Sequence, residues 1–162
     1  MTVSNGTMRN IVLLLLSCFA VTTVHAQTLN EIRLLYRDAT KSKSQAEAFY
    51  QPIKNVKQTD TPVMVAYKGS GMMLLARYEK LGDRGPLVRE AAQWIEKAVA
   101  ADPNNPEIRL IRLSVQEHLP KFLKYHQHIA EDRQFVQQSL PTVKDEGLKA
   151  MIMGYFEEFS KN

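Results

Sequence analysis

Residues 91–106 read AAQWIEKAVAADPNNP, and this stretch determines the fold class. Ala91, Ile95 and Ala98 recur at steps of three and four residues, so they lie on one face of a helix. The two small side chains let a partner helix approach closely, and Ile95 fills the space between them. Pro103 ends the helix, and the polar turn around it leads into another helix. The stretch therefore predicts a helix, a tight turn and a second helix.

The same spacing of apolar residues continues on both sides of this stretch, and no alternating run between hairpin turns predicts a strand. We therefore expect an all-α fold of six to eight helices, arranged as helical hairpins in a short superhelix or an irregular bundle. The predicted helices cover residues 29–39, 44–53, 62–81, 86–101, 107–118, 121–138 (as one helix or two short ones) and 142–160.

Capping and stop signals define several of these helix ends. Ser44 with Glu47 forms a capping-box pattern at the start of the second helix. Thr61-Pro62 provides a cap and a first-turn proline for the third helix. Gly82 is expected to end the third helix, and Pro86 to begin the fourth after a short loop.

Residues 91–103 also have the small, bulky, small and proline pattern of the second helix of a tetratricopeptide repeat. Tyr67 and Gly71 stand four residues apart, like the aromatic residue and the glycine in the first helix of that repeat. The next repeat unit along the chain lacks both the aromatic residue and the glycine. Over roughly residues 64–118 the chain thus resembles a tetratricopeptide-repeat protein. The resemblance implies stacked hairpins whose groove binds a protein or peptide partner.

Three longer segments are similar to a group of small exported proteins of Bacteroidetes-type bacteria. This resemblance implies export but supplies no mechanism. The segments are AYKGSGMMLLARY (66–78), AADPNNPEIRLIRLSVQEHLPKFLKYH (100–126) and EDRQF (131–135).

The N-terminal region reads as a secretory signal peptide over residues 1–26. Arg9 precedes an apolar run, and the small residue Ala26 suits signal peptidase, so cleavage is expected between Ala26 and Gln27. The run is too short to span a bilayer, which argues against an uncleaved anchor. Lipid attachment at Cys18 is the alternative, because Leu-Leu-Ser-Cys loosely resembles a lipobox.

The remaining residues, 27–162, form a single domain that contains no cysteine. An exported domain without disulfides depends on its apolar core, and this length suffices for one. The full chain has 21 Lys and Arg against 17 Asp and Glu. This excess is too small to predict binding to nucleic acid or to an anionic surface.

Arg109, Arg112 and Gln116 follow the spacing i, i+3, i+7 and share one side of a helix. Because arginine binds carboxylate and phosphate groups bidentately, these residues are the best candidates for an acidic ligand, with Tyr67 and Lys68 as neighbours. In the alternative interpretation both arginines are structural and pair with carboxylates such as Glu107, Glu131 or Asp132.

The sequence contains no recognisable catalytic set. His126 and His128 would point to opposite sides of a helix, and His128 with Asp132 supplies only two ligands, so no metal is expected. No serine lies in a glycine-flanked elbow, and no glycine-rich loop suits a phosphate.

These observations predict a non-enzymatic, exported module of the cell envelope, periplasmic or secreted, that binds a protein or peptide and needs no cofactor. The alternative is a protein that binds a small anionic or apolar ligand inside the bundle. A metal-dependent hydrolase is the third hypothesis. Neither a nucleic-acid partner nor a membrane span in the mature chain is expected.

Overall fold

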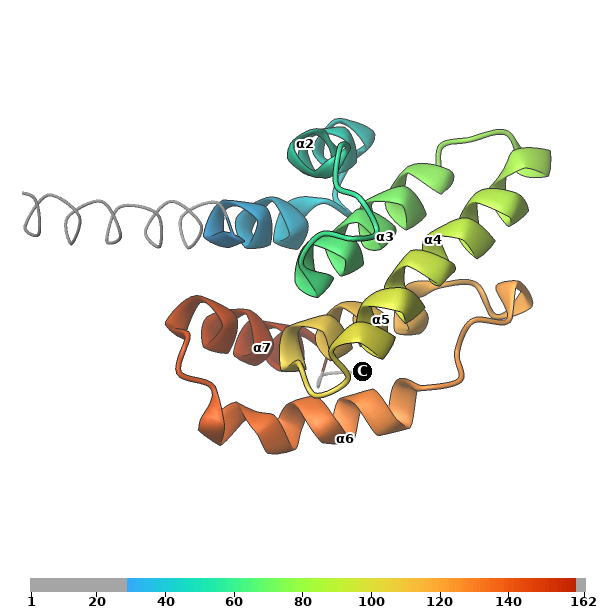
Figure 1. The fold of residues 1–162 in the computed structure, drawn as a ribbon. Helices are drawn as coiled ribbons and strands as arrows, with labels where there is room; N and C mark the ends of the chain where they lie inside the picture. The colour runs from blue at the N-terminus through green and yellow to red at the C-terminus, as the bar shows by residue number, and fades with distance from the viewer. Residues whose placement is uncertain (1–28, 160–162) are drawn as a thin grey trace, which may run out of the picture.

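Helices account for all regular structure in residues 29–159, the part of the chain that the computed structural model describes (Figure 1). Seven α-helices lie in this range and no strand, as the sequence predicts. After a first helix over residues 29–38 come α2 (Lys43–Ile53), α3 (Pro62–Ala76), α4 (Leu81–Ala101), α5 (Pro106–His118), α6 (Ile129–Ser139) and α7 (Glu146–Phe159). Two short 3-10 turns, η1 (Lys121–Leu123) and η2 (Leu140–Thr142), flank α6. The predicted signal peptide, its cleavage site at Ala26 and Gln27, and Cys18 lie outside the described residues.

The central element is α3, which is buried on every side over residues 65–71. A Cβ added at Gly69 would lie 2.8 Å from Ile95 Cγ1 and 2.9 Å from the Ala91 carbonyl of α4. A Cβ at Gly71 would lie 2.9 Å from Cδ2 of Tyr50 on α2. The two glycines thus let α4 and α2 pack closely on different sides of one helix. The sequence pattern correctly predicts a partner helix against Ala91 and Ile95.

Substituting Gly69 tests this close packing. Gly69→Ala is expected to destabilise the protein by about 1–3 kcal/mol, because the new methyl group meets backbone that cannot easily move. Gly154 in α7 is the matched control, since nothing lies within 4 Å of an added Cβ there. Gly154→Ala should stabilise the protein by about 0.5–1 kcal/mol through helix propensity. Urea unfolding followed by circular dichroism measures both, and a shift of the same sign in both variants would contradict the packing argument.

The turn between α4 and α5 follows the predicted pattern. The helix ends at Ala101, and α5 begins at Pro106 after the polar turn. The side chain of Asn105 caps α5 by accepting hydrogen bonds from the backbone amides of Glu107 at 3.0 Å and Ile108 at 3.3 Å. Proline in the first position costs no hydrogen bond, because a backbone N–H at that position would have no partner within the helix.

The predicted boundary between α3 and α4 is wrong. α3 ends at Ala76, and α4 already begins at Leu81, so that Gly82 and Pro86 both lie inside a helix. Pro86 removes only the hydrogen bond to the Gly82 carbonyl, and the residue before it, Gly85, has no Cβ to clash with the proline ring. The start of α2 also differs, since Ser42 rather than Ser44 is its cap and accepts a hydrogen bond from the Gln45 amide at 3.2 Å.

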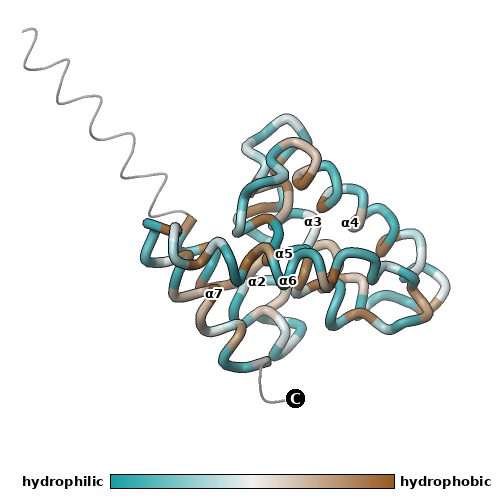
Figure 2. The backbone as a smooth tube through the Cα atoms, turned by 90° about the horizontal axis from the view of Figure 1, so that it is seen from below, coloured by the Kyte–Doolittle hydropathy of each residue, from teal (hydrophilic) through white to brown (hydrophobic). Residues whose placement is uncertain are grey.

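The first helix packs against helices that are distant in the sequence. Ile32 and Ala39 belong to the same buried cluster as side chains of α2, α3, α4 and α5. The ring of Tyr36 lies 5.2 Å from that of Phe49 and 5.5 Å from that of Tyr67. A second cluster joins α3, α4, α5 and the segment after α5, and a third joins α5, α6 and α7. Hydrophilic residues follow the outer turns of the helices in Figure 2, as one-sided burial requires.

Candidate functional site

The three residues singled out for acidic-ligand binding lie on α5 inside the protein. Arg109, Arg112 and Gln116 are all buried. Asp132 of α6, which is 0% exposed, accepts hydrogen bonds from Arg112 Nε at 2.7 Å and Arg112 Nη2 at 2.9 Å. The same carboxylate forms an ion pair with Arg109 Nε. Asp132 therefore holds both guanidiniums.

Two further carboxylates complete this arginine cluster. Arg109 Nη2 donates to Glu131, and Arg112 Nη1 donates to Glu96 of α4 at 2.8 Å. Burial disfavours the charge of Arg112, but the bonds and charges of Asp132 and Glu96 outweigh it and raise its pKa above the usual value. Both arginines thus have internal acidic partners, two of which, Glu131 and Asp132, are among those proposed in the structural interpretation of the sequence.

Gln116 has a local structural contact. Its Oε1 accepts a hydrogen bond from the backbone amide of His128 at 3.0 Å, at the start of α6. The amide of that residue needs such a partner because no preceding turn of helix supplies one. Gln116 therefore fixes the point at which the chain enters α6.

The other two predicted binding residues lie in a different part of the interior. Tyr67 is 0% exposed, and its hydroxyl donates to Glu107 Oε1 at 2.6 Å. Lys68 Nζ donates to the Tyr50 hydroxyl at 2.7 Å and to the Lys54 carbonyl. The structure thus does not bring the five predicted residues together in one open site.

A second buried ion cluster was not predicted from the sequence. Arg33 of the first helix donates to Glu107 through Nε at 2.8 Å and through Nη2 at 2.7 Å, a bidentate arrangement. Its Nη1 donates to Asn30 at 2.7 Å and to both oxygens of Asp145 at 3.0 Å. Although burial opposes the charge, Glu107 and Asp145 raise the pKa of Arg33. This cluster joins the first helix to α5 and to the start of α7.

Several buried tyrosines make the fold sensitive to alkali. Burial raises the pKa of Tyr36 to about 12, and it also raises the pKa values of Tyr67 and Tyr125. The unfolded chain loses these protons near pH 10, whereas the folded protein keeps them. The free energy of unfolding should therefore be intact below pH 10 and fall between pH 10 and 12. Phenolate absorbance and circular dichroism, recorded together, test this expectation. Ionisation of all six tyrosines near pH 10 with helicity unchanged would contradict it.

Residues 29–159 contain no group of three or more His, Cys, Asp or Glu side chains arranged for a metal ion. His128 Nδ1 lies 3.0 Å from Glu131 Oε2, and His126 Nε2 contacts the Leu119 carbonyl at 3.0 Å. Asp132, the other ligand considered with His128, faces the arginines instead. Nor does any helix in this range have the length and apolar character that crossing a bilayer requires.

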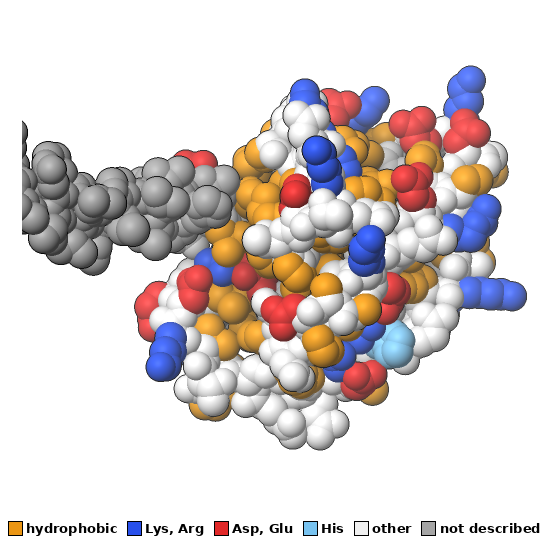
Figure 3. Space-filling model, in the orientation of Figure 1, with side chains coloured by type: hydrophobic (Ala, Val, Ile, Leu, Met, Phe, Trp, Pro, Cys, Tyr) orange, Lys and Arg blue, Asp and Glu red, His pale blue; other side chains and the backbone are white. Residues whose placement is uncertain are grey.

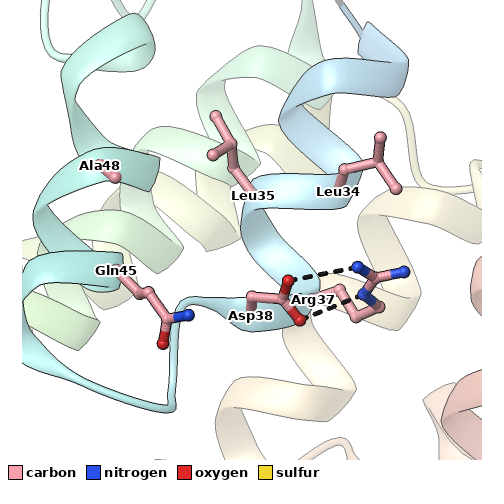
Figure 4. Close-up of a pocket in the computed structure, with 6 residues that line it drawn as sticks. All are labelled: Leu34, Leu35, Arg37, Asp38, Gln45 and Ala48. Atoms are coloured by element: carbon pink, nitrogen blue, oxygen red, sulfur yellow. Dashed lines mark hydrogen bonds and ion pairs between the residues drawn. The ribbon is translucent and has the colours of Figure 1, made fainter.

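An accessible hollow of about 240 Å³ lies between the first helix and α2 (Figure 4). Leu34, Leu35 and Ala48 supply apolar surface, and the remaining lining is polar: Arg37, Asp38 and Gln45. Asp38 accepts hydrogen bonds from Arg37 at 3.2 Å and from Lys41 at 2.7 Å, which lower its pKa to about 2. The lining of the hollow thus contains apolar side chains of both helices and an exposed charged rim at Arg37 and Asp38.

A second, more open hollow of about 250 Å³ lies after η1 and is lined by Lys124, His126 and Gln127. All three lining residues have polar side chains, and part of the lining is fixed by the bond from Gln127 Nε2 to the Lys124 carbonyl at 2.7 Å. The backbone of Lys124 has a φ of 53°, in the left-handed region, where the chain leaves η1.

No family model, no curated protein and no solved structure matches this chain. The resemblance to tetratricopeptide repeats therefore stays a prediction.

Proposed function

We propose that this protein is a non-enzymatic, exported interaction module of the cell envelope, periplasmic or secreted, that docks a protein segment in the hollow between the first helix and α2. The single observation that carries the proposal is this hollow, whose lining combines Leu34, Leu35 and Ala48 with the exposed charged pair of Arg37 and Asp38. The buried arginines pair with carboxylates inside the protein and expose little surface to an external ligand.

The size of the hollow favours a protein partner over a small ligand. Pockets for small molecules usually have volumes of roughly 300–1,000 Å³ and enclose most of the ligand. The volume here is about 240 Å³, and Leu34 at its edge is 57% exposed. An apolar side chain anchored in a small pocket, with surrounding contacts that exclude water, is typical of protein interfaces.

The rim determines which flanking residues the partner should have. Lys41 and Arg37 are 63% and 67% exposed and share Asp38 between them, so this edge carries an excess of positive charge. A partner with an apolar anchor beside an acidic residue would complement it. The predicted binding surface therefore differs from the arginines that the sequence singled out.

Photo-crosslinking in the producing cell tests the proposal. Benzoylphenylalanine in place of Leu34 should give a discrete crosslinked product, whereas the same group in place of Gln137, an exposed residue of α6, should not. Ala48→Arg, which fills the hollow, should abolish the product while leaving the circular dichroism spectrum unchanged. Equal products at both positions, or a product insensitive to Ala48→Arg, would refute the proposed docking site.

A further inference from the structure

Two large apolar side chains protrude from one end of the molecule. Leu81, the first residue of α4, is 79% exposed, and Phe122 in η1 is 75% exposed. Both are at tips between helices, the first between α3 and α4, the second after α5. Most large apolar residues of the described chain are buried or half-buried, so these two need an explanation.

A shared core fixes the two tips at the same end. Ala76 and Val88, on either side of the first tip, belong to one buried cluster with Tyr125, which follows the second tip. Leu123 packs against that cluster, next to the outward-facing Phe122. Backbone hydrogen bonds from Leu123 to Pro120 at 3.0 Å and from Lys124 to Lys121 at 3.1 Å hold the second tip in a tight turn.

Positive charge surrounds both tips. Residues 77–84 and 121–124 together carry five Lys and Arg against two carboxylates, a local excess that the balance of the whole chain conceals. Lys121 and Lys124 flank Phe122, and Arg77 and Lys80 precede Leu81. All four are exposed, and none forms an ion pair with a carboxylate in the described range 29–159. In Figure 3 Lys and Arg side chains project from the edge of the molecule where α3 meets α4.

We infer that this end, the Leu81–Phe122 tip surface, binds the surface of an anionic lipid bilayer. Protruding apolar side chains enter the boundary between headgroups and acyl chains without a preformed pocket in the partner. Flanking lysines reach back to the phosphate groups with their long side chains. The open hollow beside Lys124 and His126 offers further space for a headgroup. A folded acidic protein would instead require a concave counterpart, which two convex tips do not provide. The inference does not depend on the docking hollow, which lies between other helices.

Fluorescence of a relocated tryptophan tests the inference. Trp94 is the single tryptophan of the chain, so Trp94→Phe combined with Phe122→Trp places the only indole at the tip. The full chain, checked by circular dichroism, is mixed with vesicles of 30% phosphatidylglycerol in phosphatidylcholine. Blue-shifted emission that brominated phosphatidylglycerol quenches is expected. Trp94→Phe with Met153→Trp is the matched control, because Met153 on α7 is 45% exposed but lies away from the tips, and no quenching is expected there.

Vesicle sedimentation gives a second measurement that keeps the native tryptophan. Leu81→Ser with Phe122→Ser should reduce partitioning onto the anionic vesicles at least about tenfold. The wild type and the variant have the same N-terminal residues. Any lipid binding by those residues therefore contributes equally to both and cancels in the comparison. Equal partitioning of the wild type and this variant, quenching that is equal at positions 122 and 153, or binding that does not weaken in pure phosphatidylcholine would each overturn the inference.

Discussion

Asp132→Ala is expected to lower the free energy of unfolding by about 3–5 kcal/mol. The reason is that Asp132 is fully buried and serves both Arg109 and Arg112. Its removal leaves two buried guanidiniums with only the partly exposed carboxylates of Glu131 and Glu96. Urea unfolding monitored by circular dichroism at 222 nm measures the loss.

Glu131→Ala is the matched control on the same helix. Glu131 also pairs with Arg109, but its side chain is 57% exposed, and an exposed pair contributes only about 0–1 kcal/mol. Equal losses of stability in Asp132→Ala and Glu131→Ala would contradict a dominant effect of burial. Replacing Arg109, Arg112 and Asp132 together by apolar residues of similar size should recover most of the stability, because no buried charge is then left unpaired.

Glu107→Ala is expected to cost about 3–5 kcal/mol and to release the first helix. Glu107 binds Arg33 bidentately and accepts the hydroxyl of buried Tyr67. Without it, Arg33 keeps Asp145, whose side chain is 49% exposed, and Tyr67 loses its carboxylate acceptor. Hydrogen exchange should show lost protection in residues 29–38 before any loss in α3 and α4.

The control for this prediction is Glu146→Ala at the start of α7. The side chain of Glu146 is 82% exposed and lies 3.8 Å from Lys149, so its loss should change stability by less than about 0.5 kcal/mol. Uniform loss of protection over the whole protein in Glu107→Ala would contradict a specific role in holding the first helix.

Local sequence signals predicted the elements that depend on local chemistry. The turn before α5 was predicted correctly because Asn105 and Pro106 act within a few residues of one another. The start of α4 was not, because Gly82 and Pro86 act as stop and start signals only where the surrounding chain does not support a longer helix. In this protein the residues just before Pro86 are already part of α4, which begins at Leu81. The glycines at 82 and 85 permit the proline to lie inside the helix.

The partners of buried charged residues are harder to predict from the sequence than the ends of helices. For Arg109 and Arg112 the acidic partners on α6 could be named in advance, since the two helices are neighbours in the sequence. The sequence does contain a signal for Arg33, which lies four residues after Leu29 and three before Tyr36, on the predicted inward face. A charged residue on such a face indicates a buried ion pair. Its partner, Glu107, could not be identified because 74 residues separate the two.

This separation also sets an order of assembly. A chain made from its N-terminus presents Arg33 long before Glu107 exists, and Asp145 follows 112 residues after Arg33. Contacts that are close in sequence form early, and for the first helix these are the apolar contacts of Tyr36 with Phe49 and Tyr67. The guanidinium of Arg33 therefore has no carboxylate of its cluster until Glu107 and then Asp145 have been synthesised. The first helix thus gains its apolar contacts before its charged ones.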